Sequence, residues 1–88
     1  MIYYAYVLKS KKDSKLYYGF TRNLNNRLIE HNSGKVTSTK YRRPLHLLYF
    51  EKVNTITRAR RKEKYFKSDF GRKYIKSKLK KTAPSSNG

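Results

Sequence analysis

Cysteine is absent from the 88 residues of this chain. Disulfide bonds and thiolate metal sites are therefore excluded, and the fold must be stabilised by packing alone. A chain of this length is expected to form one domain with a modest core, because a small protein has much surface for its volume. The missing cysteine is consistent with a reducing compartment, and we expect a cytoplasmic protein.

Long apolar runs are missing as well. No stretch approaches the roughly 20 apolar residues that a membrane-spanning helix needs. Residues 1–4 enter strand-like sequence directly, without the charged region and apolar run of an export signal. No expected helix opposes a purely basic face to a purely apolar one, as a helix on a membrane surface would. The sequence therefore predicts no membrane partner.

Acidic residues are scarce. Only five Asp and Glu stand against 23 Lys and Arg, which gives a formal net charge of +18. Such a field attracts polyanions, because basic side chains displace the counterions condensed on nucleic acid. Nucleic acid is the first expected partner, and an adaptor for a membrane surface or an acidic protein is the weaker alternative. Nine Tyr and four Phe must supply most of the large apolar surface, and a buried Tyr hydroxyl needs a hydrogen-bond partner.

The first half of the chain predicts a hairpin followed by a helix. Residues 1–9 are rich in Tyr, Ile and Val, residues 10–15 form a polar turn, and residues 16–20 form the returning strand. Thr21 or Asn23 offers an N-cap for a helix of about ten residues, which Asn32-Ser33-Gly34 ends.

The second half predicts one more strand and two helices. Residues 35–43 are expected to form a basic loop, and the apolar run 45–53 to form the central strand. A helix begins at residue 54 or 55 and ends at Gly71, and a third helix spans 72–80. Residues 81–88 have few packing residues and are expected to form a disordered polar tail after a domain of residues 1–80.

One acidic residue interrupts the apolar stripe of the second expected helix. The apolar positions of this helix are Ile56, Ala59, Phe66 and Phe70, and Glu63 lies in the gap between them. An ionised Glu rarely faces a core unless it is paired or holds a metal. The alternative is an ion pair with Arg60 or Lys67 at helical spacing, a surface interaction of about 0.3–0.5 kcal/mol.

Several side chains have the chemistry that phosphodiester hydrolysis requires. The reaction needs an activated water, positive charge for the crowded phosphate, and a cation or acid for the leaving oxygen. Glu63 would hold a metal, Arg27 would neutralise the phosphate, and Tyr6, Tyr17 or His31 would move protons. Arg27 and His31 are four residues apart and therefore share one helix face. His31 has an alternative role as a helix C-terminal residue favoured by the helix dipole.

The order of these motifs resembles a known family, the GIY-YIG nucleases. The resemblance covers roughly residues 1–80 and is closest to small single-domain members related to the nuclease domain of the bacterial excinuclease incision subunit. It rests on Tyr4-Ala5-Tyr6, Tyr17-Tyr18-Gly19, Asn23-Leu24 with Arg27, His31-Asn32 and a helical Glu63.

The resemblance implies a fold, an activity and a set of site residues. The fold would be α+β, a three-stranded antiparallel sheet flanked by about three helices. The activity would be hydrolysis of DNA with one divalent ion, Mg or Mn. Arg27 looks like the catalytic arginine, Glu63 like the metal-binding carboxylate, and Tyr6 and Tyr17 like the tyrosines near the attacking water. Which of the two tyrosines is the general base stays open.

The chain departs from the family pattern at four positions. Tyr4 and Ala5 replace Gly and Ile of the first triplet, and Phe20 stands where some members have Lys. The later helix also lacks the Asn that several members have after the metal-binding Glu, since residues 64–79 contain none. These departures support a second hypothesis, a nucleic-acid-binding module of the same fold with little or no turnover.

Basic side chains outside the motifs are expected to contact the nucleic-acid backbone. The sequence shows no sign of base-specific recognition, so we expect low sequence specificity, with selectivity for a DNA structure or context, or targeting by a protein partner. The expected contacts are Arg22, Lys40, Arg42, Arg43, Arg72 and Lys73.

Overall fold

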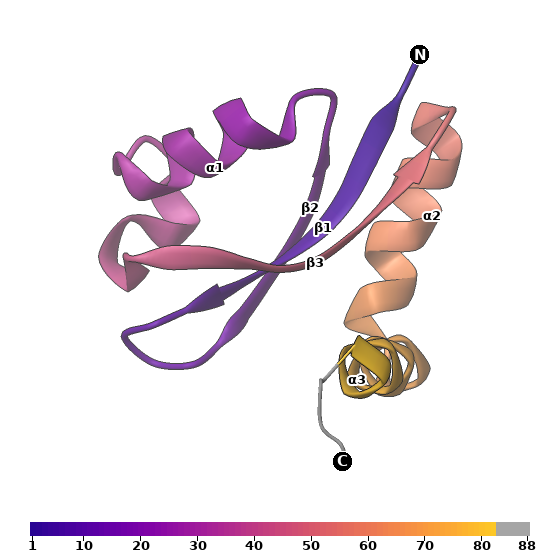
Figure 1. Ribbon diagram of the computed structural model, residues 1–88. Coiled ribbons are helices and arrows are strands. Elements are labelled where there is room, and N and C mark those ends of the chain that lie inside the picture. The colour runs from indigo at the N-terminus through magenta and orange to yellow at the C-terminus, as the bar shows by residue number, and fades with distance from the viewer. Residues whose placement is uncertain (83–88) are drawn as a thin grey trace.

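The computed structural model describes residues 1–82, and Figure 1 shows a sheet with helices on both faces. The strands pair antiparallel in the order β2-β1-β3, which confirms the predicted α+β fold with a three-stranded sheet. The elements are β1 (Tyr3–Ser10), β2 (Leu16–Thr21), α1 (Leu24–Asn32), the 3-10 helix η1 (Thr37–Arg42), β3 (Leu45–Val53), α2 (Ile56–Lys67) and α3 (Asp69–Thr82). None of these helices is long and apolar enough to cross a membrane.

The sheet separates two apolar cores. Side chains alternate along a strand, so Tyr6 and Leu8 of β1 face one side of the sheet while Ala5 and Val7 face the other. Helix α1 packs on the first side through its leucines, and α2 and α3 pack on the second (Figure 1). The hairpin and α1 thereby bring the residues around Tyr6 together on one face.

The central strand is β1, so the prediction that residues 45–53 form it is wrong. Strand β1 pairs with both neighbours, and its residues Ala5–Leu8 are buried on both faces of the sheet. Strand β3 pairs with β1 alone, and its Phe50 is 40% exposed. The pairing register of β3 with β1 shifts between Val7 and Leu8, so the apolar side chains of β3 are divided between the two cores. For this reason its continuous apolar run resembles that of a central strand.

The break between the last two helices also differs from the prediction. Helix α2 ends at Lys67, and Gly71 lies inside α3 instead of between the helices. The Ser68 hydroxyl accepts a hydrogen bond from the Gly71 amide at 3.0 Å, which begins α3 early. A Cβ on Gly71 would lie 1.7 Å from the Tyr65 carbonyl oxygen, so glycine is needed there for close packing. Phe70 is consequently 77% exposed and does not belong to the core.

The segment between α1 and β3 is more regular than the predicted basic loop. Asn23 caps α1 as expected, accepting from the Asn26 amide at 3.1 Å, and Gly34 ends the turn after it with φ of 85°. The chain then forms η1. At the other end, α3 continues to Thr82, beyond the expected boundary at residue 80, and residues 83–88 of the expected tail lie outside the described residues.

Candidate active site

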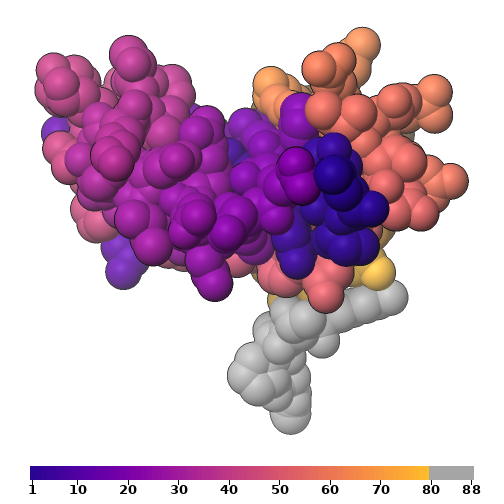
Figure 2. Space-filling model, turned by 90° about the horizontal axis from the view of Figure 1, so that it is seen from above, coloured from indigo at the N-terminus to yellow at the C-terminus, as the bar shows by residue number. Residues whose placement is uncertain are grey.

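A cleft of about 460 Å³ crosses β2 between α1 and η1 on one side and α2 on the other. Figure 2 shows the hollow between the lobe of α1 and η1 and the lobe of α2. The residues predicted to carry chemistry meet there: the cleft is lined by Tyr6, Tyr17, Arg27, His31 and Glu63, together with Gly19, Phe20, Thr39 and Lys67.

Among the five residues predicted to carry chemistry, Tyr6 is the most enclosed, with 3% of its surface exposed. It lies on the central strand directly opposite Gly19 of β2. A Cβ on Gly19 would be 2.5 Å from the Tyr6 hydroxyl oxygen and 2.7 Å from Cζ of the ring. Because Gly19 has no side chain, the Tyr6 ring can lie across β2 and bring its hydroxyl to the cleft.

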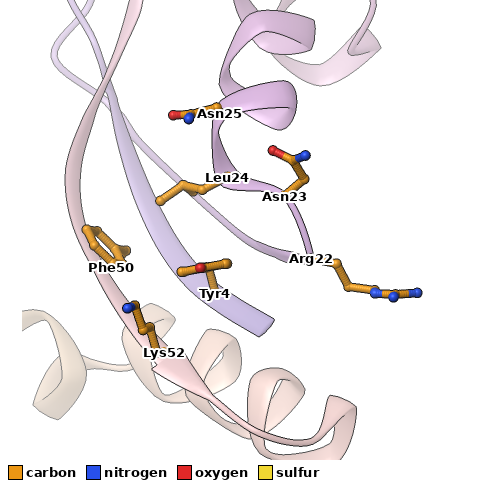
Figure 3. A pocket seen from close by; sticks show the side chains of 7 residues that line it. All are labelled: Tyr4, Arg22, Asn23, Leu24, Asn25, Phe50 and Lys52. Atoms are coloured by element: carbon orange, nitrogen blue, oxygen red, sulfur yellow. The ribbon is translucent and has the colours of Figure 1, made fainter. Parts of the chain in front are cut away.

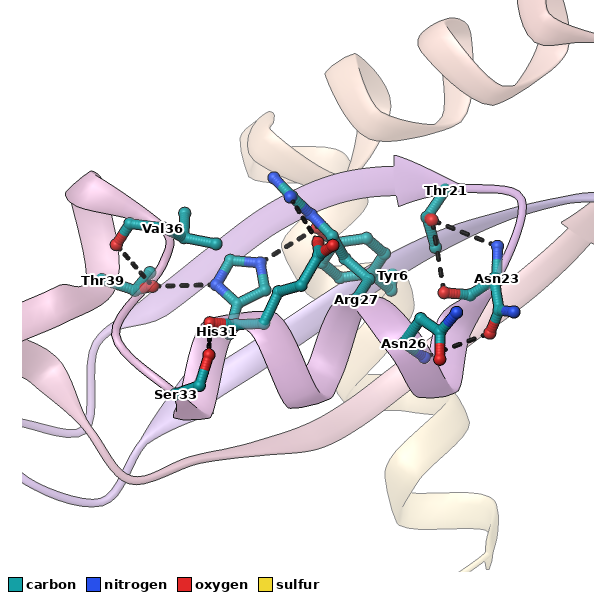
Figure 4. A network of polar contacts seen from close by, with 10 residues as sticks. Tyr6, Thr21, Asn23, Asn26, Arg27, His31, Ser33, Val36 and Thr39 are labelled. Atoms are coloured by element: carbon teal, nitrogen blue, oxygen red, sulfur yellow. Dashed lines mark hydrogen bonds and ion pairs between the residues drawn. The ribbon is translucent and has the colours of Figure 1, made fainter.

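Arg27 reaches the Tyr6 hydroxyl from α1. Its Nε donates to the Tyr6 oxygen at 3.3 Å, and its Nη1 pairs with Glu30 at 3.0 Å (Figure 4). The hydrogen bond to Tyr6, followed by that to Glu30, raises the pKa of Arg27 above its ordinary value. The guanidinium therefore keeps its positive charge beside the phenol, where it favours any negative charge on the oxygen.

His31 approaches the same hydroxyl from the next turn of α1. It is 4% exposed, and its Nε2 lies 3.2 Å from the Tyr6 oxygen while its Nδ1 lies 2.8 Å from Oγ1 of Thr39. The Thr39 hydroxyl donates to the Val36 carbonyl, so it accepts from Nδ1–H. This assigns the tautomer in which Nε2 has no proton and accepts from the Tyr6 O–H.

Burial keeps the His31 ring neutral. Desolvation, followed by the charge of Arg27, lowers the pKa of His31 below its ordinary value. A role as a residue favoured by the helix dipole would raise that pKa instead, because the C-terminal end of a helix stabilises a cation. The lowered pKa and the 3.2 Å contact with Tyr6 together favour a neutral ring whose Nε2 can accept the Tyr6 proton.

Glu63 lines the cleft from α2, and its carboxylate already has a partner. Lys67 Nζ lies 2.9 Å from Glu63 Oε2, and the two side chains are 55% and 23% exposed. The ion pair considered in the sequence analysis is therefore present, but both of its members face the cleft. Residues 1–82 contain no group of three or more His, Cys, Asp or Glu that could hold a metal.

A single carboxylate is nevertheless compatible with a magnesium or manganese ion. Mg²⁺ is commonly bound by one or two carboxylates, with waters and substrate phosphate oxygens filling the other positions. Glu63 supplies such a ligand at the wall of the cleft that holds Tyr6 and Arg27. Its pair with Lys67 is a helical i,i+4 pair, which contributes only about 0.3–0.5 kcal/mol and can be displaced.

The expected nucleic-acid contacts lie outside this cleft. Arg22 lines a second groove beside the start of α1, and Arg72 and Lys73 line a third beside α3. Lys40 is exposed on η1.

Three of the expected contact residues are also used within the fold. Arg42 pairs with Asp13 at 3.4 Å, and Arg72 with Asp69 at 2.6 Å. Arg43 donates from Nε to the Lys40 carbonyl at 2.8 Å. The first and third of these contacts hold η1 in place, and η1 in turn carries Thr39.

Three residues of the site were not found from the sequence. Thr39 orients His31, but it lies in a basic segment without periodicity and gives no signal. Asn32 exchanges two hydrogen bonds with the backbone of Leu45, at 2.8 and 2.7 Å, which fastens α1 to β3. Its place in the His31-Asn32 pair was the available signal. Lys67 was considered as a partner of Glu63, without a place in the cleft.

Comparisons with known proteins show what the chain is similar to. The family model described as the GIY-YIG catalytic domain matches residues 2–78. A UPF0213 protein of Staphylococcus saprophyticus is 36% identical over 75 residues, covering 84% of this chain and 90% of that protein. A UPF0213 protein of Syntrophus aciditrophicus is 41% identical over 66 residues, and the match covers 73% of this chain and 75% of that protein. The solution NMR structure of a UPF0213 protein of Bacillus halodurans superposes with a TM-score of 0.54 at 27% identity, covering 99% of this chain and all of that one.

Proposed function

The chain belongs to the GIY-YIG catalytic domain family, a nuclease-type family, and on that premise we propose that it is a metal-dependent endonuclease that hydrolyses phosphodiester bonds in DNA. One observation carries the proposal. The Tyr6 hydroxyl is held between a cation, Arg27, and a neutral proton acceptor, His31, at the cleft surface. A phenol in an ordinary structural role does not need both.

Tyr6 acts as the general base in this mechanism. As a water oxygen attacks phosphorus, a proton of that water passes to the Tyr6 oxygen, and the proton of Tyr6 passes to His31 Nε2. The bond from phosphorus to the leaving oxygen then breaks on the opposite side of the phosphorus, the leaving oxygen takes a proton from solvent water, and the imidazolium releases its proton to solvent. The contacts of Tyr6 thus favour it over Tyr17 as the base. Tyr17 lines the cleft beside it.

Arg27 has two tasks. Its hydrogen bond to Tyr6 favours the negative charge that develops on the phenol oxygen as the proton leaves. The same guanidinium lies in the cleft, where it stabilises the charge that accumulates on the attacked phosphate. Its ion pair with Glu30 is partly exposed, with side chains 38% and 45% accessible, and can exchange for a phosphate.

Glu63 is the residue that would hold the metal. A bound Mg²⁺ or Mn²⁺ supplies a Lewis acid for the phosphate and the leaving oxygen. Glu63 lies at the cleft wall, and the charge of +18 draws the DNA backbone toward the protein. The expected cytoplasmic location, low sequence preference and selectivity for a DNA structure or for a targeting partner belong to this proposal.

A second function is favoured by two features of the cleft. The Lys67 ion pair neutralises the carboxylate that the metal requires, and Phe20 gives the cleft an apolar wall where some members have Lys. Both features suit a nucleic-acid-binding module of the same fold with little turnover. Binding and cleavage therefore have to be measured separately.

The experiment uses labelled nicked, branched, single-stranded and duplex DNA with Mg²⁺ or Mn²⁺. The native chain is compared with Glu63→Gln, Arg27→Ala and Tyr6→Phe, and DNA binding is measured in EDTA. We expect cleavage by the native chain, a loss of about 10²- to 10⁴-fold in Tyr6→Phe, and binding within a few-fold of native. Equal cleavage rates in the native chain and in Glu63→Gln would contradict the proposal that the chain is an endonuclease. Binding of DNA without cleavage would instead support the second function, a nucleic-acid-binding module.

A further inference from the structure

A second groove lies beside the start of α1, on the same face of the sheet as Tyr6. It has a volume of about 460 Å³, and its floor is formed by the rings of Tyr4 and Phe50, whose centroids are 5.9 Å apart with planes inclined by 59°. Figure 3 shows these rings with Lys52 beside Tyr4 and with Leu24 of α1 closing one end. The proposed reaction uses none of these residues.

The groove exists because α1 covers only part of its sheet face. Leu24, the first residue of α1, belongs to the core around Tyr6, and the helix runs away from Tyr4 toward η1 (Figure 1). Beyond Leu24, none of the helices within residues 1–82 covers this face of the sheet. Phe50 is left 40% exposed, which is unusual for a large aromatic residue in the middle of a strand.

The surroundings of the rings are cationic and polar. Lys52 follows Phe50 by two residues on β3, so both side chains point to the same face, and Arg22 extends outward from the rim (Figure 3). The amide of Asn25 is exposed at the start of α1. Among the residues lining this groove no acidic side chain is present.

We propose that this groove, the Tyr4–Phe50 platform, binds one unpaired nucleotide of a nucleic-acid strand, with its base stacked on Phe50 and Tyr4 and its phosphates near Lys52 and Arg22. Aromatic rings flanked by cations bind single strands because every base has a face that can stack and every nucleotide has a charge. A duplex keeps its bases stacked on one another and cannot offer one to the platform.

The platform shares no lining residue with the cleft, but the two sites are linked through neighbouring residues of the sheet. Tyr6, which lines the cleft, is two residues from Tyr4 on β1 and opposite Phe50 in the register of β1 and β3. We extend the proposal to a strand that continues from the platform around the start of α1 to the cleft lined by Tyr6 and Arg27. Unpaired strands would then be the preferred substrate of the proposed endonuclease, and this part of the proposal rests on the proposed function. Binding of a nucleotide to the platform does not require cleavage.

The test measures binding in EDTA, so that cleavage does not enter the result. Fluorescence anisotropy gives the Kd of a labelled eight-nucleotide thymidine strand, of the same strand with abasic sites, and of a duplex of equal length. We expect Phe50→Ala to weaken binding of the thymidine strand about 5- to 100-fold, with little effect on the abasic strand and the duplex. Phe50→Tyr, which keeps a ring, should bind like the native chain.

Matched controls come from exposed residues elsewhere. Phe70→Ala removes a ring that is 77% exposed on α3, and Lys64→Gln removes the same charge as Lys52→Gln from α2. The platform is rejected if native chain does not bind the thymidine strand, if Phe50→Ala weakens binding no more than Phe70→Ala, or if it weakens all three ligands equally. A native-like cleavage rate in Glu63→Gln would reject the proposed enzyme and leave these binding results standing.

Discussion

The Tyr6 hydroxyl lies over the Gly19 backbone so closely that a Cβ on Gly19 would be 2.5 Å from its oxygen. The Tyr6 ring can avoid such a Cβ only by leaving Arg27 and His31. We expect Gly19→Ala to reduce the cleavage rate about 100-fold, because a displacement of about 1 Å of a reacting group has that effect. Steady-state kinetics of DNA cleavage will measure this reduction, and DNA binding will be measured separately in EDTA.

The control for this variant uses Tyr6→Phe. If Gly19→Ala acts by moving Tyr6, the double variant should be little slower than Tyr6→Phe alone, because there is no hydroxyl left to displace. Rate losses that multiply in the double variant would show that the glycine acts by another route.

His31 should make the stability of the protein dependent on pH. Burial lowers its pKa in the folded chain, so at pH values near and below the ordinary His value of about 6.5 the unfolded chain binds more protons. Stability is therefore fully present above that pH and is lost as the pH falls, by at most about 1.4 kcal/mol per pH unit for one proton. Urea unfolding at pH 7.5, 6.5 and 5.5 will give the slope.

His31→Gln isolates this contribution from other titrating groups. Glutamine cannot take up a proton in this range, so its unfolding free energy should change less between pH 7.5 and 5.5 than that of the native chain. Equal slopes in the two proteins would mean that His31 titrates alike in the folded and unfolded chain.

Lys67 is expected to compete with the metal for Glu63. Its Nζ lies 2.9 Å from Glu63 Oε2, and a cation bound to that carboxylate has to loosen this pair. Lys67→Gln should therefore tighten Mn²⁺ binding several-fold, as measured by the free Mn²⁺ signal in electron paramagnetic resonance. Lys64→Gln, which makes the same change of charge on the same helix, should bind Mn²⁺ like the native chain.

Glu51 joins three elements on the face of the sheet opposite Tyr6. Its carboxylate accepts from the hydroxyl of Tyr49 and, at 2.7 Å, from that of Tyr74 on α3, and it pairs with Lys62 of α2 at 2.9 Å. Desolvation alone would raise the pKa of Glu51, but the hydrogen bonds from Lys62 and the two phenols lower it below its ordinary value. The sequence analysis gave this residue no chemical role.

We expect Glu51→Ala to destabilise the fold by about 1–3 kcal/mol, because two partly buried phenol hydroxyls lose a charged acceptor. Chemical denaturation at pH 7 measures the change. Glu30→Gln is the matched control, since its ion pair with Arg27 is exposed and should change stability by less than about 1 kcal/mol. A loss no larger in Glu51→Ala than in this control would contradict the structural role.

Local structure could be predicted where it depends on neighbouring residues. The alternation of β1, the cap at Asn23 and the stop at Gly34 are determined by short-range contacts, and they are confirmed. Strand order could not be derived in the same way. The apolar run of β3 resembles that of a central strand, and only the packing of helices on both faces of β1 decides between them.

The residues of the candidate site could also be predicted only in part from the sequence. Residues with distinctive chemistry, such as Arg27 and Glu63, could be selected by type and spacing. The contacts around them join segments far apart in the chain, as in the hydrogen bond between Arg27 and Tyr6. Gly71 was wrongly expected to break a helix, since its proximity to Tyr65 appears only once α2 and α3 are packed together.

The cleft is built from two parts of the chain that are made at different times. The hairpin and α1 carry Tyr6, Arg27 and His31, but β1 cannot gain its second partner before β3 is present. Glu63 follows on α2. Since a chain is synthesised from its N-terminus, Tyr6 and Arg27 leave the ribosome before Glu63. A nascent chain therefore gains a complete cleft only after α2 has emerged.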